Sequence, residues 1–250
     1  MQILNIAGYR FVALDDLPRL RAEFKARGEA LGLKGTIVLA AEGINLFLAG
    51  AAANVAAFVQ TLRADARFAC IEVKRSWSAA LPFARLLVKI KREIVSMRRP
   101  EIHPGGTAVP RLAPREFKRW LDEGRVLALL DTRNQFEVEL GTFENTLSLG
   151  LKSFSDFPRA APALSDGLKD QPIVTFCTGG IRCEKAAPWL ISRGFREVYQ
   201  LDGGILNYFE QCGAAHFRGE CFVFDQRVTL DAGLRQTGIA PRNGCGHEPG

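Results

Sequence analysis

The segment from residue 173 to residue 186 constrains the fold of this chain more than any other. It starts with Ile173-Val174-Thr175-Phe176, an apolar and β-branched run that is typical of a fully buried strand. A loop from Cys177 to Arg182 follows, and a helical pattern comes directly after it. A buried strand that passes through a short loop into a helix is a building unit of parallel sheets. We therefore expect an α/β domain around this segment.

The residues of this loop indicate a reactive thiol. A cysteine between a strand and a helix lies among backbone N–H groups, and the helix dipole stabilises its thiolate. Gly179 and Gly180 let the loop curl with its amides inward, and Arg182 adds a positive charge. An inert buried thiol is the alternative, against which the glycines and the arginine argue. We predict Cys177 and Arg182 as catalytic residues, in an active-site loop completed by Thr178, Gly179, Gly180 and Ile181.

The length of the loop disfavours phosphatase chemistry. The spacing from Cys177 to Arg182 is Cys-x4-Arg, one residue shorter than the Cys-x5-Arg loop of cysteine phosphatases. One residue corresponds to about 3.4 Å of chain, so the smaller ring suits a sulfur atom better than a phosphate group.

Cys183 follows the loop directly and is a second candidate for sulfur chemistry. We expect its side chain to point away from the loop and to pack the helix. As an alternative, Cys183 could resolve an oxidised Cys177 by forming a disulfide.

We predict no metal site. Cys245 and His247 near the C-terminus offer only two ligands, which makes zinc a weak hypothesis. His103, His216 and His247 are too scattered along the chain to form a metal-binding triad.

The N-terminal part of the chain has the element order of a ferredoxin-like domain, β-α-β-β-α-β with one extra strand. Its hydrophobic pattern predicts helices over residues 15–32 and 51–66 and strands over 3–13, 36–40, 44–48, 70–75 and 86–95. After it, proline and glycine cluster in a segment that is typical of a linker.

Helices and short apolar strands alternate in the second part of the chain, which predicts a parallel sheet covered on both faces. The helices are expected over residues 114–123, 185–193 and 205–211, and the strands over 126–130, 173–176 and 198–201. We therefore expect an α+β ferredoxin-like domain over 1–98, a linker over 99–113, an α/β domain over 114–215 and a C-terminal extension over 216–250.

Positive charge is concentrated in the first part of the chain. Residues 1–112 hold 17 Lys and Arg against 9 Asp and Glu, a net charge of +8, whereas residues 113–250 hold 16 against 18, a net charge of −2. A basic domain favours a polyanion such as nucleic acid, although a solvated basic face is the simpler alternative. The candidates for phosphate contacts are Lys74, Arg75, Lys89, Lys91, Arg92, Arg98 and Arg99.

Aromatic residues occur among these cations. Phe47, Trp77 and Phe83 could stack on bases, but aromatic residues at such positions are more often part of the core.

The apolar content and the cysteine count indicate in which compartment the protein works. The chain is 47% hydrophobic, yet it contains no run of 18 uncharged apolar residues and no signal-peptide pattern. Six cysteines are too few for a disulfide scaffold. We expect a cytoplasmic protein that does not associate with a membrane, in which any special cysteine is catalytic or metal-binding.

The loop and two further segments resemble the rhodanese family, whose active-site cysteine carries a persulfide. The resemblance covers residues 113–212. Asp131-Thr132-Arg133 with Glu137 and Gly141 is similar to the family's D-x-R…E…G stretch, and Leu201-Asp202-Gly203-Gly204-Ile205 is similar to its L-x-GG-I turn. The resemblance implies a rhodanese-like fold, and we expect Asp131, Arg133 and Glu137 to form buried ion pairs that hold it.

A narrower resemblance, to the bacterial rhodanese-domain tRNA uridine hydroxylases, spans nearly the whole chain. It rests on residues 177–186, on the Lys34-Gly35-Thr36-Ile37 and Glu42-Gly43-Ile44-Asn45 segments and on residues 221–228. It implies oxygen-dependent conversion of the wobble uridine of tRNA to 5-hydroxyuridine, with Cys177 essential and the basic domain binding tRNA.

This resemblance leaves the activation of oxygen open. No flavin, haem or iron motif is visible, so no cofactor is identified and molecular oxygen is expected as the co-substrate. Attack of Cys177 on the uracil ring and a persulfide relay are both possible. We expect the anticodon arm of tRNA as the partner, and neither DNA nor a membrane.

Two other functions remain. A thiosulfate or persulfide sulfurtransferase would use the same Cys177, but it would leave the basic domain unexplained. A non-enzymatic RNA-binding module would carry the loop as a relic.

Overall fold

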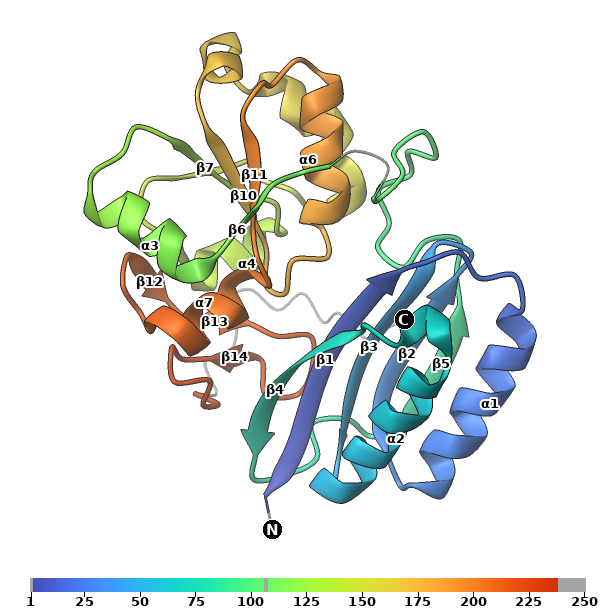
Figure 1. Cartoon of the computed structure of the whole chain (residues 1–250). Coiled ribbons are helices and arrows are strands. Elements are labelled where there is room, and N and C mark those ends of the chain that lie inside the picture. The colour runs from blue at the N-terminus through green and yellow to red at the C-terminus, as the bar shows by residue number, and fades with distance from the viewer. Residues whose placement is uncertain (1, 106–107, 238–250) are drawn as a thin grey trace.

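The computed structural model describes residues 2–105 and 108–237, which form two lobes (Figure 1). A mixed sheet with the strand order β4-β1-β3-β2-β5 forms the first lobe. Only β2 and β5 pair in parallel in this sheet. The strands are β1 (Ile3–Phe11), β2 (Lys34–Ala40), β3 (Gly43–Gly50), β4 (Glu72–Ser78) and β5 (Leu86–Ile90), and the helices are α1 (Leu17–Ala30), α2 (Ala52–Ala64) and the short 3-10 helix η1 (Ala66–Phe68). The predicted ferredoxin-like order with one extra strand is confirmed.

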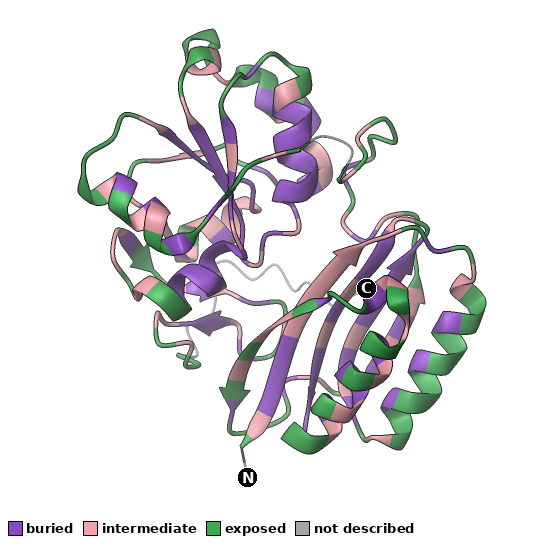
Figure 2. Cartoon of the chain, viewed as in Figure 1, coloured by how far each residue is buried: buried purple, intermediate pink, exposed green. Residues whose placement is uncertain are grey.

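The two helices of this lobe cover one face of the sheet and leave the other face turned toward the second lobe (Figure 1). Alternate strand residues such as Ile37 and Leu46 point toward the helices and pack with Phe24 and Phe58 in a buried core. Figure 2 shows this burial along the inner stripes of the helices. The uncovered face is therefore available to build a site.

The strand that we predicted over 86–95 ends at Ile90. The Lys91 amide still donates to the Leu39 carbonyl of β2 over 2.8 Å, but farther along the chain backbone amides bind side chains. The Ile94 amide donates to Glu42 over 2.7 Å, and the Met97 amide donates to Glu93 over 2.8 Å. These contacts turn the chain toward the second lobe.

The second lobe contains a five-stranded sheet with the order β6-β11-β10-β7-β9, in which every pair is parallel. Its strands are β6 (Arg111–Leu112), β7 (Ala128–Asp131), β9 (Thr146–Ser148), β10 (Ile173–Phe176) and β11 (Val198–Leu201). Apolar clusters fill both faces, one around Trp189 of α6 and one around Tyr208 of α7. The predicted parallel sheet is confirmed, and β6 lies within the segment predicted as a linker.

The helices of the second lobe are α3 (Pro114–Asp122), α4 (Gln135–Leu140), α5 (Phe157–Ala160), α6 (Cys183–Ser192) and α7 (Gly204–Cys212), with 3-10 helices η2 (Phe154–Asp156), η3 (Ala161–Ala163) and η4 (Asp166–Asp170). No helix in residues 2–105 and 108–237 is long and apolar enough to cross a bilayer.

The segment after α7 contacts both lobes. Strand β12 (Phe217–Gly219) pairs with β8 (Gly141–Phe143) of the second lobe, and β13 (Cys221–Phe222) pairs with β14 (Thr229–Leu230). Between β13 and β14, Arg227 donates to the Ser76 hydroxyl of the first lobe over 2.6 Å. The C-terminal segment therefore ties the two lobes together beside the loop that follows β10.

Candidate active site

Cys177 lies directly after β10, in a loop whose amides turn toward its sulfur. The Gly180 amide donates to Cys177 Sγ over 3.1 Å, and the Arg182 amide also hydrogen-bonds to this sulfur. The carbonyl of Cys177 accepts from the Ile205 amide of α7 over 3.0 Å. The thiol is therefore surrounded by backbone donors, as the sequence predicted for this loop.

Two glycines make this arrangement possible. Gly180 has φ +97°, and a Cβ there would lie 3.0 Å from Tyr9 Oη. Gly204 has φ +65°, and a Cβ there would lie 2.4 Å from the Cys177 carbonyl oxygen. A side chain at either position would meet both backbone strain and a close neighbour. The absence of a side chain at Gly204 lets the start of α7 pack directly against the backbone of the active-site loop.

The surroundings of Cys177 favour its thiolate. Burial is the largest effect and opposes ionisation, but a hydrogen bond from Cys183, the charge of Arg182 and the backbone donors outweigh it. Together they lower the pKa of Cys177 to about 6. Cys177 is therefore mostly ionised at neutral pH, which is the nucleophilic form of a cysteine.

Cys183 lies against Cys177 and does not point away from the loop, so our expectation for its side chain was wrong. Its thiol hydrogen-bonds to Cys177, and its sulfur lies 3.8 Å from the Thr132 hydroxyl. Cys183 is the first residue of α6, and side chains of a helix tilt toward its N-terminus, here toward the loop. Burial, followed by the neighbouring Cys177, raises the pKa of Cys183 well above its ordinary value, so Cys183 is the protonated partner.

Buried ion pairs hold the loop from behind, as expected. Arg133 and Asp131 pair at 2.7 Å with both side chains inaccessible. Glu137 pairs with Arg182 at 2.8 Å and accepts a hydrogen bond from the Thr178 hydroxyl over 3.3 Å. The Glu137 carboxylate thus orients two residues of the active-site loop, a role that goes beyond holding the fold.

Cys177 lines a cleft of about 780 Å³ between the loop and the uncovered face of the first sheet. The cleft combines aromatic rings with cations and amide groups. Its lining includes Tyr9, Phe11, Asn45, Phe47, Lys74 and Phe83 from the first lobe, Arg111, Thr178, Gly179, Ile181, Arg182 and Glu184 from the second lobe, and Phe224 from the C-terminal segment.

Tyr9 of β1 reaches across the cleft to the loop. Its hydroxyl donates to Glu184 over 2.9 Å, and the Arg111 guanidinium contacts the same carboxylate at 2.6 Å. Burial, and then the negative charge of Glu184, raises the pKa of Tyr9 well above its ordinary value. Tyr9 is therefore a neutral hydrogen-bond donor, and the first lobe contributes directly to the environment of Cys177.

Lys185, in the first turn of α6, joins the lobes on the other side of the loop. Its ammonium group lies 2.9 Å from Glu42, 2.7 Å from Glu93 and 3.0 Å from the Val95 carbonyl. Sequence reasoning assigned no role to Tyr9, Glu184 or Lys185. The only signal was that Glu42, Glu184 and Lys185 belong to the segments on which the family resemblance rests.

The seven cations predicted to bind RNA do not lie together. Lys74 lines the cleft, whereas Arg75 is paired with Ile6 on the opposite face of β4. Lys89 pairs with Val38, and so lies on the cleft side of the sheet, but it is not in the lining. Lys91, Arg92, Arg98 and Arg99 are exposed beyond β5.

The three aromatic residues considered for base stacking also lie on different faces of the first sheet. Phe47 and Phe83 line the cleft. Trp77 is 46% exposed and is paired with Leu4 on the opposite face, so the expectation that it is a core residue was wrong. Phe224, which sequence reasoning did not single out, is 39% exposed and has its ring centroid 6.4 Å from that of Phe47. Its ring also lies 5.4 Å from the Arg182 guanidinium carbon.

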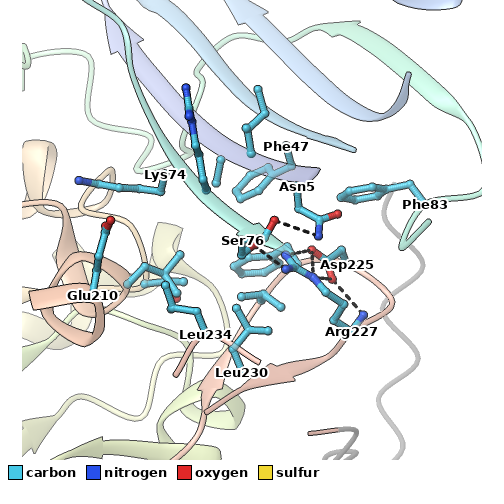
Figure 3. A pocket seen from close by; sticks show the side chains of 17 residues that line it. Asn5, Phe47, Lys74, Ser76, Phe83, Glu210, Asp225, Arg227, Leu230 and Leu234 are labelled. Atoms are coloured by element: carbon cyan, nitrogen blue, oxygen red, sulfur yellow. Dashed lines mark hydrogen bonds and ion pairs between the residues drawn. The ribbon is translucent and has the colours of Figure 1, made fainter. Parts of the chain in front are cut away.

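A smaller pocket of about 30 Å³ lies beside the cleft (Figure 3), and Phe224 is among its lining residues. Its walls come from β1, β3, β4, α7 and the C-terminal segment. Figure 3 shows Asp225 and Arg227 against Ser76, and Arg227 pairs with Asp225 at 2.6 Å. Because Arg227 also donates to the Ser76 hydroxyl, it connects Asp225, the residue after Phe224, to the first lobe.

Cys245 and His247, for which zinc was a weak hypothesis, lie outside the described residues. Within residues 2–105 and 108–237, no group of three or more His, Cys, Asp or Glu side chains is arranged to hold a metal ion.

Comparisons with known proteins agree with this two-lobe arrangement. Residues 3–94 match the model of the UPF0176 acylphosphatase like domain, and residues 113–211 match that of the rhodanese-like domain. A protein of Bordetella petrii is 52% identical over 241 residues, covering 94% of this chain and 96% of its own. A protein of Variovorax paradoxus is 53% identical over 234 residues, covering 92% and 89%. Both relatives are named tRNA uridine(34) hydroxylase.

Proposed function

Because this chain belongs to the tRNA uridine(34) hydroxylase family, we propose that it converts uridine 34 of tRNA to 5-hydroxyuridine at Cys177, with molecular oxygen as co-substrate. The observation that carries the proposal is the position of the Cys177 thiolate at a cleft between two lobes. The cleft volume of about 780 Å³ lies within the range of roughly 300–1,000 Å³ for small-ligand sites.

The lining of the cleft suits a flipped base from an RNA loop. Unpaired bases bind by stacking on aromatic rings and by hydrogen bonds at their edges. Phe47 and Phe224 offer rings on one side of the cleft. Asn45 donates its side-chain amide to the Ile94 carbonyl over 3.3 Å, and no described residue donates to its Oδ1. This oxygen is available to accept the N3–H group of a uracil ring.

The anticodon arm is the part of tRNA that we propose for this cleft, because it presents uridine 34 in a single-stranded loop. Lys74 and Arg111 line the cleft and can contact the phosphates beside the flipped nucleotide. The exposed cations beyond β5 can track the backbone farther away. DNA and membranes have no part in this proposal.

The chemistry that we propose begins with addition of the Cys177 thiolate to C6 of the uracil ring. This addition places negative charge on C5 and O4, and C5 becomes nucleophilic enough to react with oxygen. Oxygen adds at C5 to give a hydroperoxide, and loss of the C5 proton and of the thiolate from C6 then restores the C5=C6 double bond. The low pKa of Cys177 supports attack by the thiolate itself.

Nucleoside mass spectrometry of tRNA tests the proposal. Cells that lack the protein are complemented with the wild type or with Cys177→Ala, and purified protein is incubated with unmodified tRNA under air or under argon. We expect 5-hydroxyuridine only with the wild type and only under air, with the label of oxygen-18 gas in the product. Product formation by Cys177→Ala, or under argon, would refute the proposed role of the cysteine or of oxygen.

A sulfurtransferase is the second candidate, since residues 113–211 match the rhodanese-like domain. In that case, Cys177 would accept a sulfur atom from thiosulfate and pass it to cyanide or a thiol. The contact of Tyr9 with Glu184 argues against it, because a plain sulfurtransferase does not need a first lobe over its loop. Rapid turnover of thiosulfate and cyanide, without any effect on tRNA, would establish this alternative.

A further inference from the structure

Two thiols share the active-site loop, and the proposed addition of Cys177 to uracil uses only one of them. Cys183 is inaccessible to solvent and does not line the cleft, so it cannot meet the substrate. Its side chain neighbours that of Cys177 at the start of α6. The Cys183 amide donates to the Gly180 carbonyl over 3.0 Å, and the Gly180 amide donates to Cys177 Sγ over 3.1 Å, so Gly180 connects the two cysteines.

The proposed hydroxylation needs more electrons than uridine supplies. Reduction of one oxygen molecule to the level of a hydroxyl group and water takes four electrons. Oxidation of the C5–H bond of uridine to C5–OH provides two. Two thiols that become one disulfide provide the other two, together with the two protons of the water molecule.

We propose that Cys183 resolves an oxidised Cys177 in each catalytic cycle and that the two residues form a disulfide. This inference rests on the proposed hydroxylase function. The released Cys177 thiolate attacks the outer oxygen of the C5 hydroperoxide and the O–O bond breaks. One oxygen atom therefore remains as the C5 hydroxyl group, and the other is left on Cys177 as a sulfenic acid. The Cys183 sulfur then attacks Cys177 Sγ, the S–S bond forms, and the S–OH oxygen leaves as water with the proton of the Cys183 thiol.

The surroundings of Cys183 suit this step. The Thr132 hydroxyl donates its own proton to the Phe176 carbonyl over 2.9 Å and lies 3.8 Å from the Cys183 sulfur, so its oxygen can accept the S–H proton of Cys183 as the attack proceeds. Cys221 instead donates to the Phe222 carbonyl, and Cys212 lies at the end of α7. Cys70 lines the cleft, but it is exposed on the first lobe. Among the described cysteines, Cys183 is the one whose side chain interacts with that of Cys177.

Return to the starting state requires an external dithiol. Because Cys183 is wholly buried and Cys177 faces the cleft, the reductant is expected to attack Cys177 Sγ and to release Cys183 first. The enzyme therefore consumes one dithiol for each 5-hydroxyuridine formed.

The test uses purified full-length protein, unmodified tRNA and air, at a pH of about 8.5 so that Cys177 is ionised in every variant. One sample contains dithiothreitol, and one contains no reductant. Free thiols are alkylated after acid quenching, and peptides are analysed by mass spectrometry. The variants are Cys183→Ala and Cys183→Ser, with Cys212→Ala as the matched control outside the site.

Without reductant, we expect the wild type and Cys212→Ala to form about one product per active site and to accumulate a Cys177–Cys183 disulfide. With dithiothreitol, both turn over repeatedly. Without reductant, both Cys183 variants are expected to complete the first turnover and to hold Cys177 as a dimedone-reactive sulfenic acid, with no disulfide.

Three results would overturn the inference. In the first, the wild type forms product in the first turnover but no disulfide, which leaves the hydroxylase function intact. In the second, the Cys183 variants end the first turnover without reductant and carry no sulfenic acid at Cys177. In the third, wild-type protein forms no product in any turnover, which refutes the hydroxylase function and the resolving step with it. Thermal unfolding of Cys183→Ser checks that a loss of turnover is not a loss of fold.

Discussion

The ammonium group of Lys185, in the first turn of the helix that follows the active-site loop, lies 2.7 Å from the carboxylate of Glu93 in the first lobe. Glu42 pairs with the same ammonium group at 2.9 Å, and the Lys185 side chain is only 3% exposed. The helix that stabilises the Cys177 thiolate is thus anchored to the lobe that forms the opposite wall of the cleft. The position of the thiolate depends on the contact between the lobes.

Replacement of Lys185 by alanine is expected to loosen the two lobes. It leaves two carboxylates without their buried partner, a change that typically destabilises a protein by about 3 kcal/mol or more. Thermal unfolding followed by calorimetry should show a lower transition temperature, and hydroxylation should be lost. Lys169→Ala, which removes an exposed ion pair with Asp166, is the control and should leave the unfolding temperature unchanged. Equal stability of the two variants would contradict this account of the interface.

The ionisation of Cys177 should be visible in its alkylation rate. Because the folded protein lowers the pKa of Cys177 to about 6, the rate with iodoacetamide should rise through pH 6 and be level above pH 7. Cys183→Ala removes a hydrogen bond to the thiolate and should move the midpoint to higher pH. Cys212→Ala should not move it. A wild-type midpoint near the ordinary value of about 8.5 would show that the loop does not activate this thiol.

Phe224→Ala should weaken substrate binding without changing the thiol. Stacking of a base on an aromatic ring contributes about 1–3 kcal/mol, so we expect KM for tRNA to rise by roughly tenfold. The alkylation midpoint of Cys177 should stay as in the wild type. Trp77→Ala, on the opposite face of the sheet, should leave KM unchanged. A larger effect of Trp77→Ala than of Phe224→Ala would place the tRNA elsewhere.

Lys74 and Arg75 provide a matched test of the side on which tRNA binds. They are neighbours in sequence and carry the same charge, but strand geometry places Lys74 in the cleft and Arg75 on the opposite face. Lys74→Ala should weaken tRNA binding and lower its dependence on salt, measured by filter binding at several salt concentrations. Arg75→Ala should change binding less. The reverse order would refute the assignment of the cleft as the tRNA site.

Much of the fold could be predicted from local patterns. Alternation and turn residues located the ferredoxin-like lobe, and the buried run before Cys177 located the parallel sheet. The ends of strands were less predictable. The segment after Ile90 reads as strand, but it turns away because Glu42 and Lys185, distant in sequence, bind its backbone and its Glu93 side chain.

The candidate site was predictable where one short segment contains it. Cys177, its glycines and Arg182 are contiguous, and their chemistry follows from residue type and spacing. Tyr9, Asn45 and Phe224 were not predictable as parts of the same cleft. Asn45 and Phe224 belong to segments on which the family resemblance rests, but local sequence does not show that three residues so far apart along the chain line one cleft.

The sequence by itself determined a thiolate-stabilising loop, a parallel sheet to carry it and a basic first domain, because these properties depend on short-range pattern and on charge counting. Only the tertiary structure decided that Cys183 lies against Cys177, that the side of the strand with Lys74 forms the cleft, and that Tyr9 reaches Glu184. Such contacts depend on how two independently patterned lobes dock. Their docking is set by buried pairs such as Lys185 with Glu93, whose partners lie far apart along the chain.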